Sequence, residues 1–218
     1  MNTHSIRRRA PRFELNGDAL CIDFVNTLDD RPSEQPKELL NSYIDLARFA
    51  EDTGILELSH VDELMKRSQM DPEGAQRVLR AAIELREAMY AIFHAIMKKE
   101  TVPTMALAQL NACAQDAAQH VRLVATNRHF EWRFDYSSSF DAILWPIARS
   151  AADLLASDQL KFVRACGSKT CQWLLVLSIS CSISRRPVLC RSKTARIYEA
   201  SPSAGSATGR DASIASSS

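Results

Sequence analysis

The sequence predicts a mainly α fold: a helical N-terminal domain with one β-hairpin, followed by a small C-terminal α+β module. Apolar residues recur every three or four positions through most of residues 13–160, the spacing of one helix face. The pattern changes to alternation over residues 121–135, which is typical of strands. Four of the six cysteines fall in residues 164–196, a segment that is also rich in basic residues.

The first elements follow a basic arm at residues 1–12. Residues 13–15 predict a short strand, and the Asn-Gly pair after it predicts a turn. Apolar residues at helical spacing then predict a helix over residues 20–28. The sequence DDRP at 29–32 ends this helix, because aspartate and proline favour turns.

Start and stop signals place the next three helices. An amphipathic stripe over residues 39–50 ends before Gly54, a residue suited to the left-handed conformation that follows many helices. Ser59 is a candidate N-cap for a short third helix. The sequence DPE at 71–73 offers an N-cap acceptor, a proline at the first helical position and an early acid. It begins the longest helix, whose apolar stripe runs over residues 78–96.

The last elements of the helical domain show both the helical spacing and the strand-like alternation of apolar residues. Residues 104–117 predict another helix. Residues 121–125 and 130–134 alternate on either side of the sequence TNR, which predicts a β-hairpin. Residues 140–160 return to helical spacing.

Length and composition indicate one domain of ordinary size plus a small module. The chain has 218 residues, of which 46% are hydrophobic, enough for a buried core. No apolar run reaches the roughly 20 residues of a membrane span, and the N-terminus lacks the apolar stretch of a secretion signal. We therefore expect a cytoplasmic protein, in which cysteines are thiols or metal ligands rather than disulfides.

Basic charge is concentrated at the C-terminal end. Residues 161–218 hold nine Lys/Arg against two Asp/Glu, a net +7, and the remaining residues hold 18 against 24, a net −6. This asymmetry favours a polyanion contact at the end of the chain, and a tail that only increases solubility is the alternative. The expected units are a disordered basic arm at 1–12, a helical domain at 13–160, a module at 161–198 and a disordered serine-rich tail at 199–218.

Catalytic signatures are absent from the sequence, and we expect no enzyme. It contains no phosphate-binding glycine loop, no G-x-S-x-G and no H-E-x-x-H. Asp23 and Asn26 nevertheless stand among apolar residues in CIDFVNT, where polar groups need internal partners. A structural hydrogen-bond network is the favoured interpretation, and a small-ligand pocket is the alternative.

The strongest chemical pattern is Cys166-x4-Cys171 followed by the apolar run WLLV. Two cysteines on either side of a short polar turn can face one metal ion, and zinc prefers four tetrahedral thiolate or imidazole ligands. Cys181 and Cys190 are the nearby candidates for the second pair, although their spacing is unlike that of a zinc knuckle. The alternative is a pair of thiols beside a buried strand, with no metal.

Together these segments resemble the CGNR zinc-finger family, whose N-terminal part is the ABATE domain. LNGDALCIDFVNTLDDRP looks like the family opening L-x-G-x-x-L-x-x-D-F-x-N-T, which here includes Asp23 and Asn26. LLNSYIDLARFAEDTGIL and LREAMYAIFHAI are similar to its next two helical segments. KFVRACGSKTCQWLLV looks like the start of the finger, and the resemblance covers residues 13–176.

The resemblance implies a transcription regulator whose zinc finger binds DNA and whose helical domain senses a signal or forms a homodimer. Cys166 and Cys171 would be the first two zinc ligands. The implied phosphate-contacting residues are Lys169, Arg185, Arg186, Arg191 and Lys193. Phosphate contacts of this kind give salt-dependent affinity rather than sequence choice.

The second half of the finger departs from the family pattern. The family continues approximately S-R-R-W-C-x4-C-G-N-R, whereas this chain reads SRRPVLC and contains no CGNR. Either Cys181 and Cys190 complete a distorted site, or the module is degenerate, or the reading frame has shifted near residues 176–190. Two other classes of function stay open: a small-ligand-binding or enzymatic helical domain, and a helical interaction module with an inactive tail.

Overall fold

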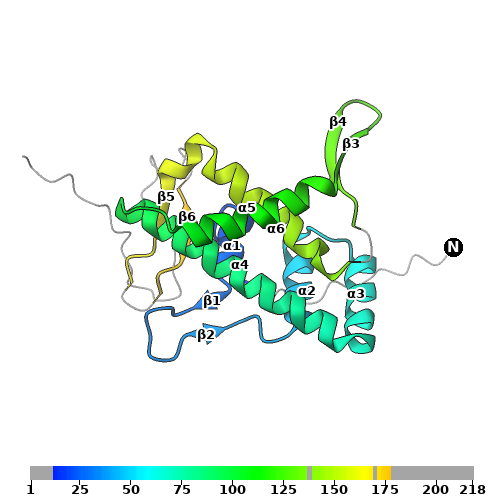
Figure 1. Ribbon diagram of the computed structural model, residues 1–218, viewed down its shortest axis with the longest axis horizontal. Coiled ribbons are helices and arrows are strands. Elements are labelled where there is room, and N and C mark those ends of the chain that lie inside the picture. Colours follow the sequence, from blue (N-terminus) through cyan, green and yellow to red (C-terminus); the bar gives the residue numbers. More distant parts are fainter. Residues whose placement is uncertain (1–11, 137–138, 169–170, 178–218) are drawn as a thin grey trace, which may run out of the picture.

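The computed structural model describes residues 12–136, 139–168 and 171–177, and its described part is mainly helical, as predicted (Figure 1). The α-helices in chain order are α1 (Leu20–Val25), α2 (Tyr43–Thr53), α3 (Leu58–Met70), α4 (Pro72–Lys98), α5 (Thr104–Gln119) and α6 (Leu144–Leu155). Two short 3-10 helices, η1 (Phe140–Ile143) and η2 (Asp158–Phe162), flank α6. None of the helices in these ranges is long and apolar enough to cross a membrane.

The strands of the described residues form three separate two-stranded antiparallel sheets. They pair β1 (Leu28–Asp29) with β2 (Lys37–Glu38), β3 (Val121–Ala125) with β4 (Phe130–Phe134), and β5 (Val163–Ala165) with β6 (Leu174–Val176). The hairpin predicted over residues 121–135 is confirmed as β3–β4. The strand predicted at residues 13–15 is wrong: Phe13 packs into the core, and its backbone N–H donates to Asp52 instead of to a strand.

Local capping signals set the bounds of α2 and the start of α4. The Asp71 carboxylate accepts a hydrogen bond from the Gly74 N–H at 2.8 Å, and Pro72 occupies the first turn of α4, as the sequence predicts. In α2, Ser42 and Asp45 form a reciprocal capping box, so the helix begins at residue 43 rather than at 39. Gly54 follows α2 with φ of 72°, the predicted left-handed stop.

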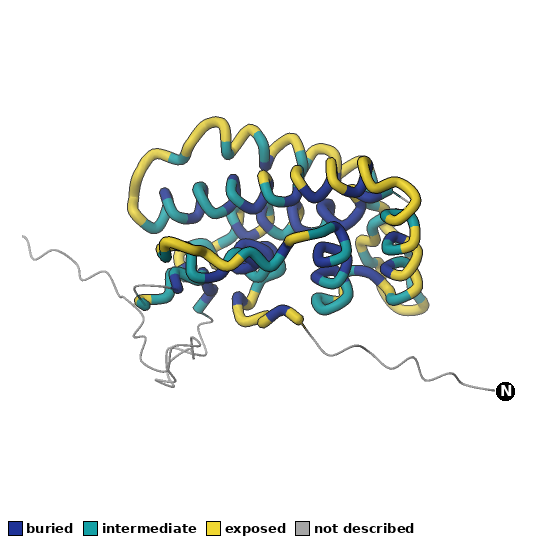
Figure 2. Tube along the Cα trace, turned by 90° about the horizontal axis from the view of Figure 1, so that it is seen from below, coloured by how far each residue is buried: buried dark blue, intermediate teal, exposed yellow. Residues whose placement is uncertain are grey.

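One apolar core joins the helices to the C-terminal sheet. It includes the fully buried Phe24 of α1, Phe49 of α2 and Leu85 of α4, and extends to Leu174 and Val176 of β6. Figure 2 shows buried segments through the middle of the molecule and exposed ones along its outer helices. Residues on both sides of position 160 therefore share a single core.

The β3–β4 hairpin projects from the body at the opposite end from β5–β6 (Figure 1). One of its faces carries the cross-strand pairs Val121–Phe134, Leu123–Trp132 and Ala125–Phe130. Phe130 is 69% exposed, Trp132 65% and Leu123 54%. Its charged residues lie on the opposite face and at its base, where Arg122 pairs with Asp135, and Arg133 with Glu131.

Candidate functional site

The cysteine segment forms a short hairpin. Val163–Ala165 pair with Leu174–Val176, and the Cys166 N–H donates to the Trp173 carbonyl at 2.7 Å, which extends the ladder to the first cysteine. Cys171 lies on the other arm and is 4% exposed. Cys166 therefore directly follows β5, and Cys171 precedes β6, so that one cysteine lies on each arm of the hairpin.

Cys166 and Cys171 are the two predicted zinc ligands that lie in the described residues. Within the described ranges, no three His, Cys, Asp or Glu side chains gather as a possible metal site. The other two predicted ligands, Cys181 and Cys190, lie outside the described residues. So do all five predicted phosphate-contacting residues, which are Lys169, Arg185, Arg186, Arg191 and Lys193.

Asn26 joins the helical domain to this hairpin. Its amide nitrogen donates to the Leu174 carbonyl at 2.8 Å, and its amide oxygen accepts from the Leu174 N–H at 2.8 Å. Both residues are buried, with exposures of 4% and 2%. The side chain thus imitates the two hydrogen bonds that a neighbouring strand would make.

Two further side chains of the helical domain hold the preceding hairpin residues. The Trp173 indole N–H donates to the Asp29 carboxylate at 2.8 Å, and the Tyr90 hydroxyl bonds to the Gln172 amide oxygen at 3.0 Å. We call Asn26, Asp29 and Tyr90 the hairpin clamp. The sequence assigned only a turn role to Asp29, which it also performs by accepting the Asp30 N–H.

Asp23 and Gly17 secure the same edge of β6, the one that faces away from β5, two residues after Leu174. The Gly17 N–H donates to Asp23 at 2.7 Å, and the Gly17 carbonyl accepts from the Val176 N–H at 3.1 Å. A Cβ at Gly17 would lie 2.6 Å from a methyl group of Ile22 and 2.9 Å from the Asp23 backbone nitrogen. Only glycine allows this close approach, so Asp23 also serves the attachment of the hairpin.

Burial raises the pKa of Asp23 from 3.8 to about 6, against the opposing hydrogen bond from Gly17. Since the folded state then binds a proton more tightly than the unfolded chain does, this carboxyl stabilises the fold fully below about pH 4. The contribution is lost as the pH rises through about 6.

Asp23→Asn is expected to remove this pH dependence, because the amide does not titrate and keeps an oxygen for the Gly17 N–H. Relative to the variant, the wild type should lose about 1–2 kcal/mol of stability between pH 4 and 6.5, after a discount for partial exposure. Urea unfolding over this pH range measures the difference, with the exposed Asp62→Asn as control. Parallel curves for Asp23→Asn and the wild type would contradict the assignment.

A buried ion network lies beside the clamp. Arg86 of α4 is 2% exposed and donates two hydrogen bonds of 2.7 Å to the two carboxylate oxygens of Glu38. It also reaches Glu87 at 2.8 Å and the hydroxyl of Thr27, the residue after Asn26, at 3.3 Å. The ion network therefore depends on Arg86, which pairs with the carboxylates of both Glu38 and Glu87.

The network continues to the clamp through Arg31. Its guanidinium donates to both oxygens of Glu87, at 2.7 and 3.2 Å, and lies 4.0 Å from the centre of the Tyr90 ring. Burial alone would raise the pKa of Glu87, but Arg31 and Arg86 hold it below its ordinary value. Tyr90 thus contacts the ion network with its ring and the hairpin with its hydroxyl.

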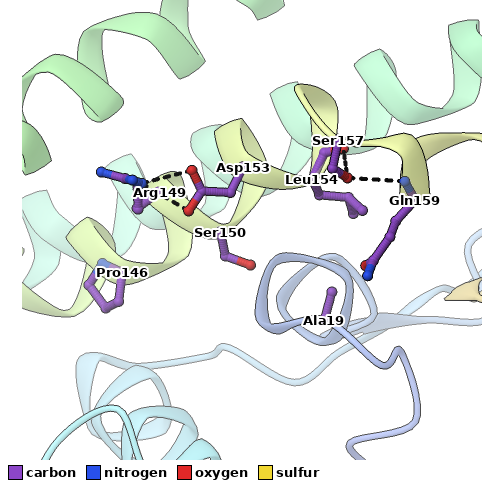
Figure 3. A pocket seen from close by; sticks show the side chains of 8 residues that line it. All are labelled: Ala19, Pro146, Arg149, Ser150, Asp153, Leu154, Ser157 and Gln159. Atoms are coloured by element: carbon purple, nitrogen blue, oxygen red, sulfur yellow. Dashed lines mark hydrogen bonds and ion pairs between the residues drawn. The ribbon is translucent and has the colours of Figure 1, made fainter. Parts of the chain in front are cut away.

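An open pocket of about 460 Å³ lies elsewhere, between α1, α6 and η2. It is lined by Ala19, Pro146, Arg149, Ser150, Asp153, Leu154, Ser157 and Gln159. Figure 3 shows Ser150 and Gln159 directed toward α1, with Arg149 held by Asp153. Neither Asp23 nor Asn26, the residues of the predicted ligand pocket, lines it.

The fold and this site define a helical domain that builds a cysteine hairpin into its own core. The family model ABATE, described as "Putative stress-induced transcription regulator", matches residues 18–158. The match spans more than half of the chain, and the protein belongs to the ABATE family. A search of curated proteins finds no match. The matched segment contains Asp23 and Asn26 and ends before Cys166. The family description names a regulator rather than an enzyme.

Proposed function

We propose that the protein is a DNA-binding transcription regulator in which Cys166 and Cys171 supply two of the four ligands of a structural zinc ion. The observation that carries this proposal is the β5–β6 hairpin, which holds Cys166 and Cys171 between its strands and packs into the core of a domain that matches a regulator family. Thiolates are the donors that structural zinc sites prefer. When bound, zinc would cross-link the hairpin to the chain that follows it.

The second pair of ligands in this proposal is Cys181 and Cys190. A zinc ion bound by them would bring the basic residues of the 161–198 segment close to the hairpin. Arginine and lysine there would neutralise DNA phosphates, which gives affinity that falls steeply with salt. The acidic body would stay away from the duplex, because its net charge of −6 repels phosphate.

We expect one zinc per chain in the purified protein and its loss in Cys171→Ser. The reason is that a tetrahedral site that loses one of its four thiolates binds zinc far more weakly. Elemental analysis after dialysis measures the stoichiometry. Cys113→Ser is the matched control, because this half-buried cysteine lies on α5, outside the cysteine hairpin. A wild-type protein without zinc would refute the metal part of the proposal.

DNA affinity should fall linearly on a log–log plot against salt concentration. Arg185→Ala and Arg186→Ala are each expected to reduce that slope by about 1, with a similar loss on every DNA sequence. Fluorescence anisotropy at several salt concentrations measures both effects. Arg80→Ala, an exposed arginine of α4, should leave the slope unchanged. A DNA affinity that does not change with salt concentration, or no DNA binding, would favour a different class of function.

The expected homodimer has a suitable surface in the apolar face of β3–β4. This face carries no charge, so two copies can meet about a two-fold axis without repulsion. Aromatic side chains bury about 150–250 Å² each, so Phe130, Trp132 and Leu123 cover less than the roughly 800 Å² per partner of a standard interface. We therefore propose a weak homodimer, with dissociation in the micromolar range.

Trp132→Arg is expected to abolish this association, because it places a charge at the centre of the face. Light scattering with size-exclusion chromatography from 5 to about 200 micromolar chain, the range of weak interfaces, measures the mass. Met70→Arg, at a 79% exposed position on α3, is the control. A monomer over the whole range would exclude the dimer, whatever the variant does.

A further inference from the structure

The three residues that follow Cys171 are each held by a different side chain of the helical domain. Tyr90 holds Gln172, Asp29 holds Trp173, and Asn26 holds Leu174. We propose that this hairpin clamp is a template that positions Cys171 before any metal binds, with Asn26 as the main positioning residue. The metal consequence rests on the proposed function, whereas the positioning itself does not.

Asn26 contributes most to the positioning of Cys171, because its side chain forms hydrogen bonds with two backbone groups at once. The Leu174 N–H and carbonyl both point away from β5 in the antiparallel ladder, where they would otherwise face the apolar core. Unpaired backbone groups in such a place are costly. Removing the Asn26 amide should therefore open β6 locally rather than leave it in place.

The backbone next to Cys171 needs this support. Gln172 has φ of 52°, a left-handed conformation that residues with a Cβ adopt rarely. Its side chain is fixed by the Tyr90 hydroxyl, and the next residue is fixed through its indole by Asp29. These two hydrogen bonds stabilise the backbone conformation next to Cys171. In this conformation Cys171 is buried, with 4% of its surface exposed.

The template changes how a metal would be bound. Many small zinc modules are unfolded without their metal and must order the chain when it binds. Here Val163, Leu174 and Val176 already belong to the core of the helical domain. The clamp thus orders Cys171 before zinc binds. An intact clamp should therefore raise zinc affinity, and bound zinc should stabilise the clamp by the same factor.

Thiol labelling of the full-length protein in excess chelator tests the positioning without any metal. Cys171 should react slowly in the wild type and about 10–100-fold faster in Asn26→Ala, the range expected from losing two buried hydrogen bonds. Mass spectrometry of peptides separates Cys171 from Cys113, which serves as the internal reference. Asn41→Ala, which removes an exposed amide bonded to the Glu38 carbonyl, should react like the wild type.

Asp29 provides a second pair of variants in case Asn26→Ala does not fold. Asp29→Asn keeps an oxygen for the Trp173 indole and should protect Cys171 as the wild type does. Asp29→Ala removes that acceptor and should accelerate labelling. Equal labelling rates of Cys171 in Asp29→Ala, Asn26→Ala and the wild type would overturn the template.

Competition with a chromophoric chelator then measures zinc affinity in the same proteins. Affinity should fall at least about tenfold in Asn26→Ala and Asp29→Ala and stay unchanged in Asn41→Ala. If the wild type binds no zinc while labelling follows the expected pattern, the proposed metal site fails and the template stands. Equal zinc affinity in all variants would overturn the linkage.

Discussion

Replacing Arg86 with alanine is expected to lower the free energy of unfolding by about 3–5 kcal/mol. The substitution leaves the Glu38 carboxylate, which is 29% exposed, without the two hydrogen bonds that offset its burial. It also removes the hydrogen-bond donor to the Thr27 hydroxyl. Because Arg86 is buried, with 2% of its surface exposed, the substitution leaves a cavity as well. Breaking one half of a buried ion pair costs more than the intact pair contributes.

Urea unfolding, monitored by circular dichroism, measures this loss of stability. Arg80→Ala is the matched control, since it removes an exposed arginine of the same helix and should change stability by no more than about 0.5 kcal/mol. Arg86→Met keeps much of the side-chain volume and separates cavity from charge. If Arg86→Ala were as stable as Arg80→Ala, the ion network would have no structural role.

Phe49→Ala is expected to cost about 3–5 kcal/mol as well, because it leaves a large cavity in the core. Phe49 is fully buried, and its ring meets Phe13 and Phe24 edge-on at centroid distances of 5.4 and 5.3 Å. It thereby holds the N-terminal segment and α1 against α2. Because α1 leads into Asn26, the variant should also speed the labelling of Cys171.

Thermal and urea unfolding measure the stability of this variant, and Phe130→Ala is the control. Phe130 is the same residue type but 69% exposed on β4, so its removal should change stability by no more than about 0.5 kcal/mol. A small loss in Phe49→Ala, comparable with that of Phe130→Ala, would mean that the core closes around the missing ring.

Most helices and the β3–β4 hairpin could be predicted because their signals are local. The Asp71 cap, the Gly54 stop and the alternation around residues 121–135 each depend on residues within one or two turns. The helix predicted over residues 20–28 instead ends at Val25, and Ser59, the predicted N-cap of α3, lies inside the helix, whose N-cap is Glu57. The start of α2 is predicted too early, because the apolar stripe begins at residue 39, before the first residue of the helix, Tyr43. Only the Ser42–Asp45 capping box marks its first turn.

The roles of Asp29 and Tyr90 could not be predicted, because their partners lie far away in the sequence. Asp29 and Trp173 are separated by 144 positions, and Tyr90 and Gln172 by 82. The sequence does contain one signal: a tryptophan beside a buried run needs an acceptor for its indole N–H. It does not say which of the 26 acidic side chains supplies that acceptor.

The sequence by itself determined the helical class, the order of most elements and the need of Asp23 and Asn26 for internal partners. Periodicity and capping are properties of short segments, so they survive without knowledge of the fold. Only the tertiary structure decided that those partners are the residues of a cysteine hairpin. A side chain amide can replace a strand only when two distant segments are brought within 3 Å, and packing of the common core is what brings Asn26 to Leu174.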